Sequence, residues 1–151
     1  MRTASPSLTS LPKWAAQDEP GVSGWREETS LDLASAERRI SSVIGSLSGE
    51  PSDEQIRSIW SAYAEVEKSV AFIKFDLDEE NPGRFTKLSN YRVPDERQAL
   101  QFALKNLRKG ADDFALGDFH QSLKELREAR NYLRALLREK RLRRVRKGRS
   151  G

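Results

Sequence analysis

The chain has 151 residues, of which 33% are charged and 36% hydrophobic, and it carries a formal net charge of +4 at pH 7. This length fits one domain with a modest core. The absence of cysteine excludes disulfides and thiolate chemistry, and with a single histidine, His120, no zinc site and no cofactor is predicted.

Residues 1–28 are predicted to form a disordered tail, because prolines and glycines lie among serines and threonines without a sustained apolar period. No apolar run approaches the ~18 residues that span a bilayer, so we expect neither a membrane span nor a secretory signal. The first 17 residues lack acids, which also suits an organelle transit peptide. A cytoplasmic location is expected, with nuclear and organellar locations left open.

Two tryptophans, Trp14 and Trp25, stand in this tail. An indole in a polar segment can anchor a docking motif in a partner's pocket, which makes both residues candidate partner-binding sites. The alternative is that they pack back onto the helices.

The first helix is predicted from about residue 31 to residue 47, where apolar residues recur at spacings of three and four and Gly49 offers an exit. The second helix has the clearest start signal, because Ser52 and Gln55 have the spacing of a capping box. Near residues 70–75 the pattern becomes apolar nearly all round. We interpret this stretch as a deeply buried part of the helix, with a short extended segment as the alternative.

The third helix is predicted to open at Pro94-Asp95-Glu96 and to continue through Gly110 toward Leu116. Gly117-Asp118 then makes a tight turn into a fourth helix. The expected core draws on all four helices and consists of Ile40, Val43, Ile56, Trp60, Tyr63, Leu104, Leu107, Leu126 and Leu133.

Residues 104–137 resemble a single tetratricopeptide-type helical hairpin. The resemblance lies in Gly110 inside the first helix, Gly117-Asp118-Phe119 at the turn and Ala129 in the second helix. Ser122 takes the place of the family's usual small residue after the turn, the closing proline is missing, and no second copy follows. One such unit cannot bury its own face. We therefore predict an all-α fold, a three- or four-helix bundle that ends in this hairpin.

No catalytic pattern is recognised, and the chain is predicted not to be an enzyme. Hairpins of this kind also occur in ribonuclease domains associated with nucleotide transferases, whose active sites resemble Arg-polar-x4-His. Arg130-Asn131 begins that pattern, but Leu136 occupies the histidine position. The adjacent Asp112 and Asp113 face different ways on a helix and do not form an acid/base pair.

Basic residues accumulate at the C-terminus. Between residues 138 and 149 eight cations accompany one acid, Glu139, so this segment carries +7 and the other residues carry −3, the difference between +4 and +7. Arginine's planar fork matches phosphate, and each neutralised phosphate releases counterions. The predicted nucleic-acid-binding residues are Arg134, Arg138, Lys140, Arg141, Arg143, Arg144, Arg146, Lys147 and Arg149.

The sequence thus divides into a disordered tail (1–28), a helical bundle (29–138) and a basic tail that extends the last helix (139–151). We expect contact with the phosphates of nucleic acid, RNA in preference to DNA, or of a ribonucleoprotein. The alternative is a protein-interaction adaptor that uses the hairpin groove or the tryptophan tail. Binding to an anionic membrane and a nuclear-localisation signal stay open. Leu136 and Leu137 leave an apolar edge that suits a homodimer.

Overall fold

The computed structural model describes residues 24–77 and 95–150, with side chains placed through residue 140. These residues form four helices, α3 (Gly24–Ser46), α4 (Asp53–Asp76), α5 (Glu96–Ala115) and α6 (Phe119–Ser150). No strand occurs in these ranges, so the prediction of an all-α fold is confirmed.

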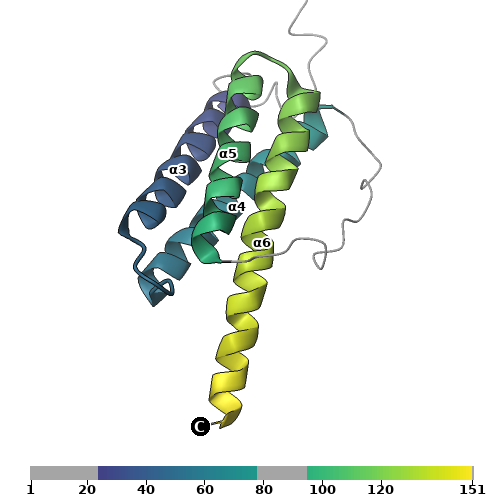
Figure 1. Ribbon diagram of the computed structural model, residues 1–151. Helices are drawn as coiled ribbons and strands as arrows, with labels where there is room; N and C mark the ends of the chain where they lie inside the picture. The colour runs from purple at the N-terminus through teal and green to yellow at the C-terminus, as the bar shows by residue number, and fades with distance from the viewer. Residues whose placement is uncertain (1–23, 78–94, 151) are drawn as a thin grey trace, which may run out of the picture.

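The helices pack as two antiparallel hairpins, α3 with α4 and α5 with α6 (Figure 1). The hairpins lie side by side, with α4 against α6 and α3 against α5. Because α5 begins at the end of the bundle opposite to the end of α4, these two further pairs are antiparallel as well (Figure 1). The result is a four-helix bundle.

The predicted starts of the second and third helices are present. Ser52 is the N-cap of α4, and its hydroxyl accepts from the Gln55 backbone N–H at 3.1 Å while the Gln55 side chain accepts from the Ser52 N–H at 2.8 Å. The capping box is therefore confirmed. Asp95 caps α5, with its carboxylate 2.6 Å from the Gln98 backbone nitrogen. The turn between α5 and α6 places Gly117 at φ +83°, where glycine has no steric penalty.

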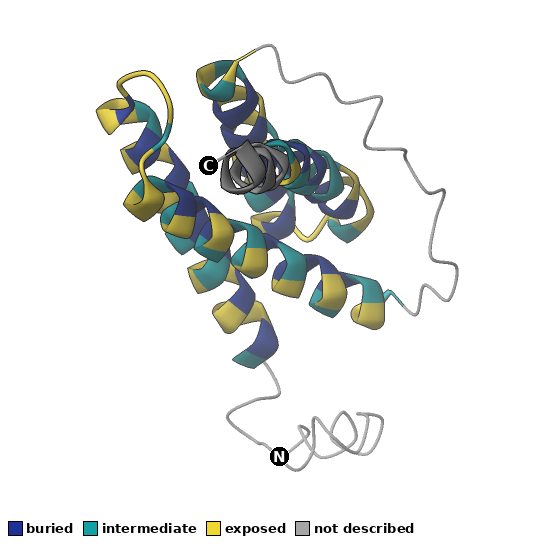
Figure 2. Cartoon of the chain, turned by 90° about the horizontal axis from the view of Figure 1, so that it is seen from below, coloured by how far each residue is buried: buried dark blue, intermediate teal, exposed yellow. Residues whose placement is uncertain are grey.

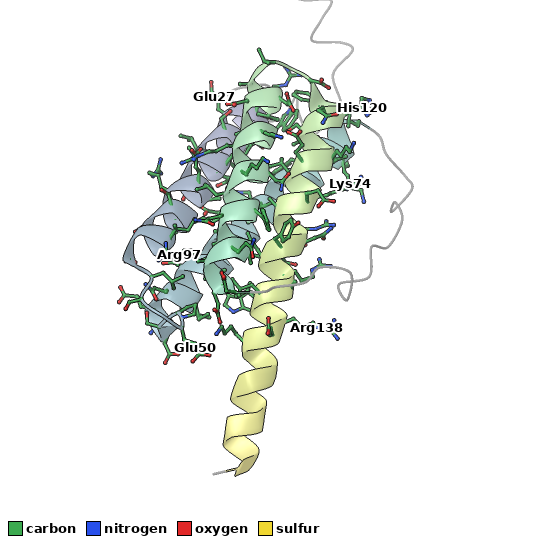
Figure 3. All side chains as sticks on the ribbon, viewed as in Figure 1. Glu27, Glu50, Lys74, Arg97, His120 and Arg138 are labelled. Atoms are coloured by element: carbon green, nitrogen blue, oxygen red, sulfur yellow. The ribbon has the colours of Figure 1, made fainter. Side chains whose placement is uncertain are left out.

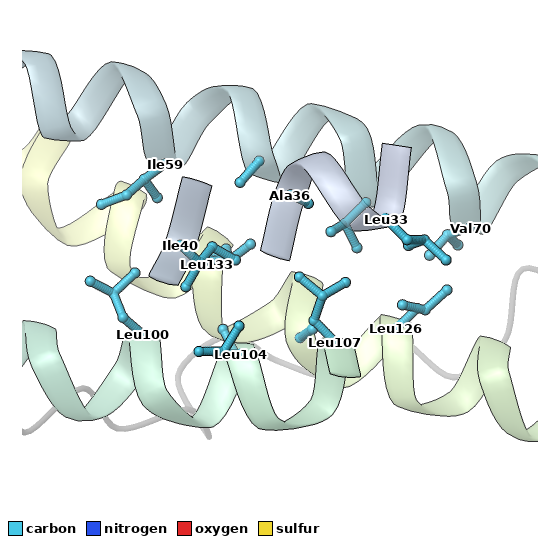
Figure 4. Close-up of a cluster of buried hydrophobic side chains, with 14 of the residues drawn as sticks. Leu33, Ala36, Ile40, Ile59, Val70, Leu100, Leu104, Leu107, Leu126 and Leu133 are labelled. Atoms are coloured by element: carbon cyan, nitrogen blue, oxygen red, sulfur yellow. The ribbon is translucent and has the colours of Figure 1, made fainter. Parts of the chain in front are cut away.

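The core lies between all four helices, and each helix turns its buried residues inward (Figures 2 and 4). The predicted core residues are buried with two exceptions. Tyr63 is only partly buried, and Trp60 is 47% exposed. The apolar stretch near residues 70–75 is helical through Asp76, with Val70 and Ile73 buried and Phe75 exposed.

Trp25 extends the first helix toward the N-terminus. α3 begins at Gly24 and not near residue 31, because the Trp25 indole, 8% exposed, joins the core. Its ring centroid lies 6.0 Å from that of Phe114 and 5.8 Å from that of Phe119. The predicted boundary of the tail at residue 28 is therefore wrong for residues 24–28, while residues 1–23 lie outside the described residues.

Helices α5 and α6 approach each other closely at Gly110. A Cβ atom at this position would lie 2.6 Å from Leu126 Cδ2 and 2.7 Å from Leu126 Cγ. The buried Ser122 hydroxyl donates to the Gly110 carbonyl at 2.6 Å, which gives its polar group a partner inside the core. Leu126, which faces Gly110, is fully buried, and so is Ala129 three residues further along α6.

We expect Gly110→Ala to destabilise the protein by about 1–2 kcal/mol, because overpacking against Leu126 outweighs the higher helix propensity of alanine. The matched control is Gly45→Ala in α3, where a Cβ meets nothing within 4 Å and stability should rise by roughly 0.5–1 kcal/mol. Urea unfolding measures both. If Gly110→Ala also destabilises a Leu126→Ala background, the clash is not the cause.

Candidate nucleic-acid interface

The C-terminal part of α6 projects beyond the other three helices (Figure 1). At the level where it leaves the bundle, Arg138 points away from the packed helices (Figure 3). Arg138 is exposed, and no ion pair with another described side chain involves it. Arg141 and the basic residues beyond it belong to the same helix, and their side chains lie outside the described residues.

Lys140 ties α6 to the end of the bundle. Its ammonium group lies 2.6 Å from Glu96 Oε1 in the first turn of α5 and 3.0 Å from Glu50 Oε1 before α4. The Lys140 side chain is 11% exposed, and that of Glu96 is 18% exposed. Lys140 was predicted to contact phosphate, but in the structure its charge is already matched by two carboxylates. It is a structural residue within the folded domain.

We expect Lys140→Met to destabilise the fold by about 1–2 kcal/mol, because it leaves two carboxylates without their cation in a partly desolvated site. Arg138→Met removes the same charge two residues earlier from an exposed position and should stay within about 0.5 kcal/mol of the wild type. Chemical denaturation compares the two variants. Equal stabilities would show that the Lys140 ion pairs contribute nothing.

Arg134 and Arg130 lie against α4 in an ion-pair network. Arg134 Nε donates to the Tyr63 hydroxyl at 3.0 Å, and its guanidinium lies 5.9 Å from the centroid of the Tyr63 ring. Glu67 forms ion pairs with both cations, at 3.2 Å from Arg130 and 3.7 Å from Arg134. Two arginines therefore share one carboxylate, so the three charges of this network sum to +1.

Trp60 lies beside this network. It was predicted to be a core residue, but it lies at the surface. The Trp60 and Tyr63 rings meet edge to face with centroids 5.8 Å apart. The buried stripe of α4 has a complete spacing of three and four residues without Trp60, because Ala62 stands between Ile59 and Val66. Trp60 is an additional apolar residue that this stripe does not require, and this was the signal that its indole lies outside the core.

The apolar surfaces expected to bind partners are largely used inside the fold. Leu136 and Leu137 are 1% and 3% exposed, so the edge that suggested a homodimer is covered within one chain. Trp25 packs back onto the helices, which was the alternative to a docking role, and is a core residue. Trp14 lies outside the described residues, and its docking role stays a prediction.

A carboxyl pair bridges the α5–α6 hairpin near its turn. Burial and a hydrogen bond with Glu125 raise the pKa of Asp113, and the charge of Asp118 acts in the same direction. Glu125 Oε1 also accepts from the Gln121 side chain at 3.1 Å. The adjacency of Asp112 and Asp113 did not reveal this pair, because its members come from different helices.

Because the folded state raises the pKa of Asp113 above its ordinary value of 3.8, the folded protein binds more protons than the unfolded chain above that pH. Stability should therefore fall as pH rises through the raised pKa. Asp113→Asn is expected to raise the Tm at pH 7 and to flatten this part of the pH profile. Asp112→Asn, in the same turn, controls for charge at the helix end. Equal effects of the two variants would rule out the Glu125 contact as the cause.

No protein-family model matches the sequence, and neither a curated protein nor a solved structure shows significant similarity to it. Within residues 24–77 and 95–150, no helix has the length and apolarity to cross a membrane, and no group of three His, Asp or Glu side chains could hold a metal ion. The functional argument therefore rests on the geometry and charge of this chain.

Proposed function

We propose that the chain is a non-enzymatic helical binding protein whose arginine-rich C-terminus contacts the phosphates of RNA or of a ribonucleoprotein. The observation that carries this proposal is the course of α6, which continues as one helix through Ser150 beyond the anchor at Lys140. Six basic residues follow this anchor with no acid among them.

A helix is well suited to present these charges along a phosphate backbone. It rises about 1.5 Å per residue, so residues 141–150 cover roughly 15 Å, enough for several phosphates. Positions 134, 138 and 141 fall on one side of α6, and exposed Arg138 links the ion-pair network on the bundle to the projecting end. Phosphate contacts of this kind give affinity without reading sequence.

The structure of the bundle favours this proposal over the adaptor alternative. The adaptor alternative would use the groove of the hairpin, but α3 packs against α5 and α4 packs against α6, so the bundle itself covers part of both hairpin helices. The buried Trp25 leaves only Trp14 for a docking tail. In our proposal the hairpin is the scaffold from which the basic helix extends.

The test is a salt titration of binding to structured RNA and to duplex DNA, using the full chain and a version that ends at Lys140. This truncation keeps the ion pairs with Glu50 and Glu96, so the bundle stays intact. We expect the full chain to bind with an affinity that falls steeply with salt, by about one power of ten per tenfold salt for each phosphate contacted. In the truncated chain the affinity should depend far less on the salt concentration.

A charge-matched control separates the tail from general positive charge. Replacing Arg141, Arg143 and Arg144 by glutamine should weaken binding, whereas replacing the exposed Arg38, Lys105 and Lys109 of α3 and α5 should not. Equal losses in the two triple variants, or unchanged binding by the truncated chain, would contradict the proposal.

A further inference from the structure

Trp60 is an exposed aromatic residue held in a fixed orientation. Nearly half of its surface contacts solvent, although indoles are among the most costly side chains to expose. Its edge-to-face contact with Tyr63 orients one side of the ring system, and Tyr63 is itself fixed by the hydrogen bond from Arg134. The packing of α4 on α6 therefore presents a pre-organised aromatic surface.

The register between α4 and α6 places Trp60 among the arginines of α6. Arg130 of α6 pairs with Glu67 of α4. One turn further along α6, Arg134 contacts Tyr63, which lies one turn earlier in α4 because the two helices are antiparallel. The next turn in each direction brings the positions of Arg138 and Trp60 to the same level. The exposed Trp60 thus lies where α6 leaves the bundle, at the start of the projecting basic helix.

A cation precedes Trp60 at helical spacing, and further cations lie along the facing helix α6. Its helical neighbours three and four residues away on α4 are Ile56, Arg57, Tyr63 and Ala64, which include one cation and no acid. Arg57 is exposed. From α6, Arg134 contacts Tyr63, and exposed Arg138 follows one turn further along the helix. Of the acids on these helices, Glu67 forms ion pairs with Arg130 and Arg134. Asp53 lies two turns before Trp60 on α4, and Glu139 follows Arg138 on α6.

An exposed indole bordered by arginines has the chemistry that binds single-stranded nucleic acid, since a base stacks on the ring while its phosphates meet the cations. We propose that Trp60 is a stacking site for an unpaired base. This inference rests on the proposed function and narrows its ligand from nucleic acid in general to single strands. Duplex bases are already stacked on one another and do not reach the indole.

The test compares a short oligouridine with a duplex RNA of the same length, using fluorescence anisotropy and the full chain. We expect Trp60→Ala to weaken binding of the single strand on the order of ten-fold and to leave duplex binding within about two-fold. Trp60→Phe should recover part of the loss. Leu31→Ala removes another exposed apolar side chain, 70% exposed on α3, and should change neither affinity.

A second readout reports the stacking itself. In a Trp14→Phe background the fluorescence comes from the buried Trp25 and the exposed Trp60. Oligouridine should quench the Trp60 component, and the duplex should not. The quenching should disappear when Trp60→Phe is added to this background. It should persist at low salt when the Trp14→Phe chain is truncated after Lys140.

The outcomes separate this inference from the proposed function. If truncation removes binding but Trp60→Ala changes neither affinity nor quenching, the stacking site is wrong and the phosphate-binding tail stands. If Trp60→Ala weakens single-strand binding while the truncated chain binds as well as the full chain, the tail is wrong and the stacking site stands. If the full chain binds no nucleic acid at low salt, both are wrong.

Discussion

The close contact between α5 and α6 at Gly110 is the constraint on which the rest of the structure depends. A side chain here would meet the fully buried Leu126, and the Ser122 hydroxyl closes the contact on the Gly110 carbonyl at 2.6 Å. With the two backbones this near, α6 keeps its buried residues in the core along most of its length. Its C-terminal direction follows from that packing, so the course of the basic segment is set by a small residue far from it in sequence.

The same packing sorts the basic residues of α6 into two groups. Arg130 and Arg134 lie against α4 and share the Glu67 carboxylate, while Lys140 is held between Glu50 and Glu96. Buried or partly buried cations need such partners, because an isolated charge loses its hydration without compensation. Arg138 and the positions after Lys140 extend past this network. The acids of a mildly acidic body therefore stabilise the base of a strongly basic helix.

The local signals in the sequence located the helices well, because capping and turn chemistry act over a few residues. Ser52 with Gln55, the helix opening at Asp95 and the turn at Gly117 all occur as the pattern indicated. The two described tryptophans were each assigned to the wrong environment. Trp25 looked like part of a polar tail but meets rings from α5 and α6, whereas Trp60 looked like core but faces solvent beside Arg134.

The sequence by itself determined the helical class, the starts of α4 and α5 and the separation of a basic end from an acidic body, since periodicity, caps and charge are local properties. Only the tertiary structure decided which residues of each helix are covered. It paired Lys140 with Glu96, brought Asp113 to Glu125, and placed Trp60 at the level where α6 leaves the bundle. These relations depend on how α4 and α5 are positioned against α6, and contacts between distant segments leave no periodic signal in a single chain.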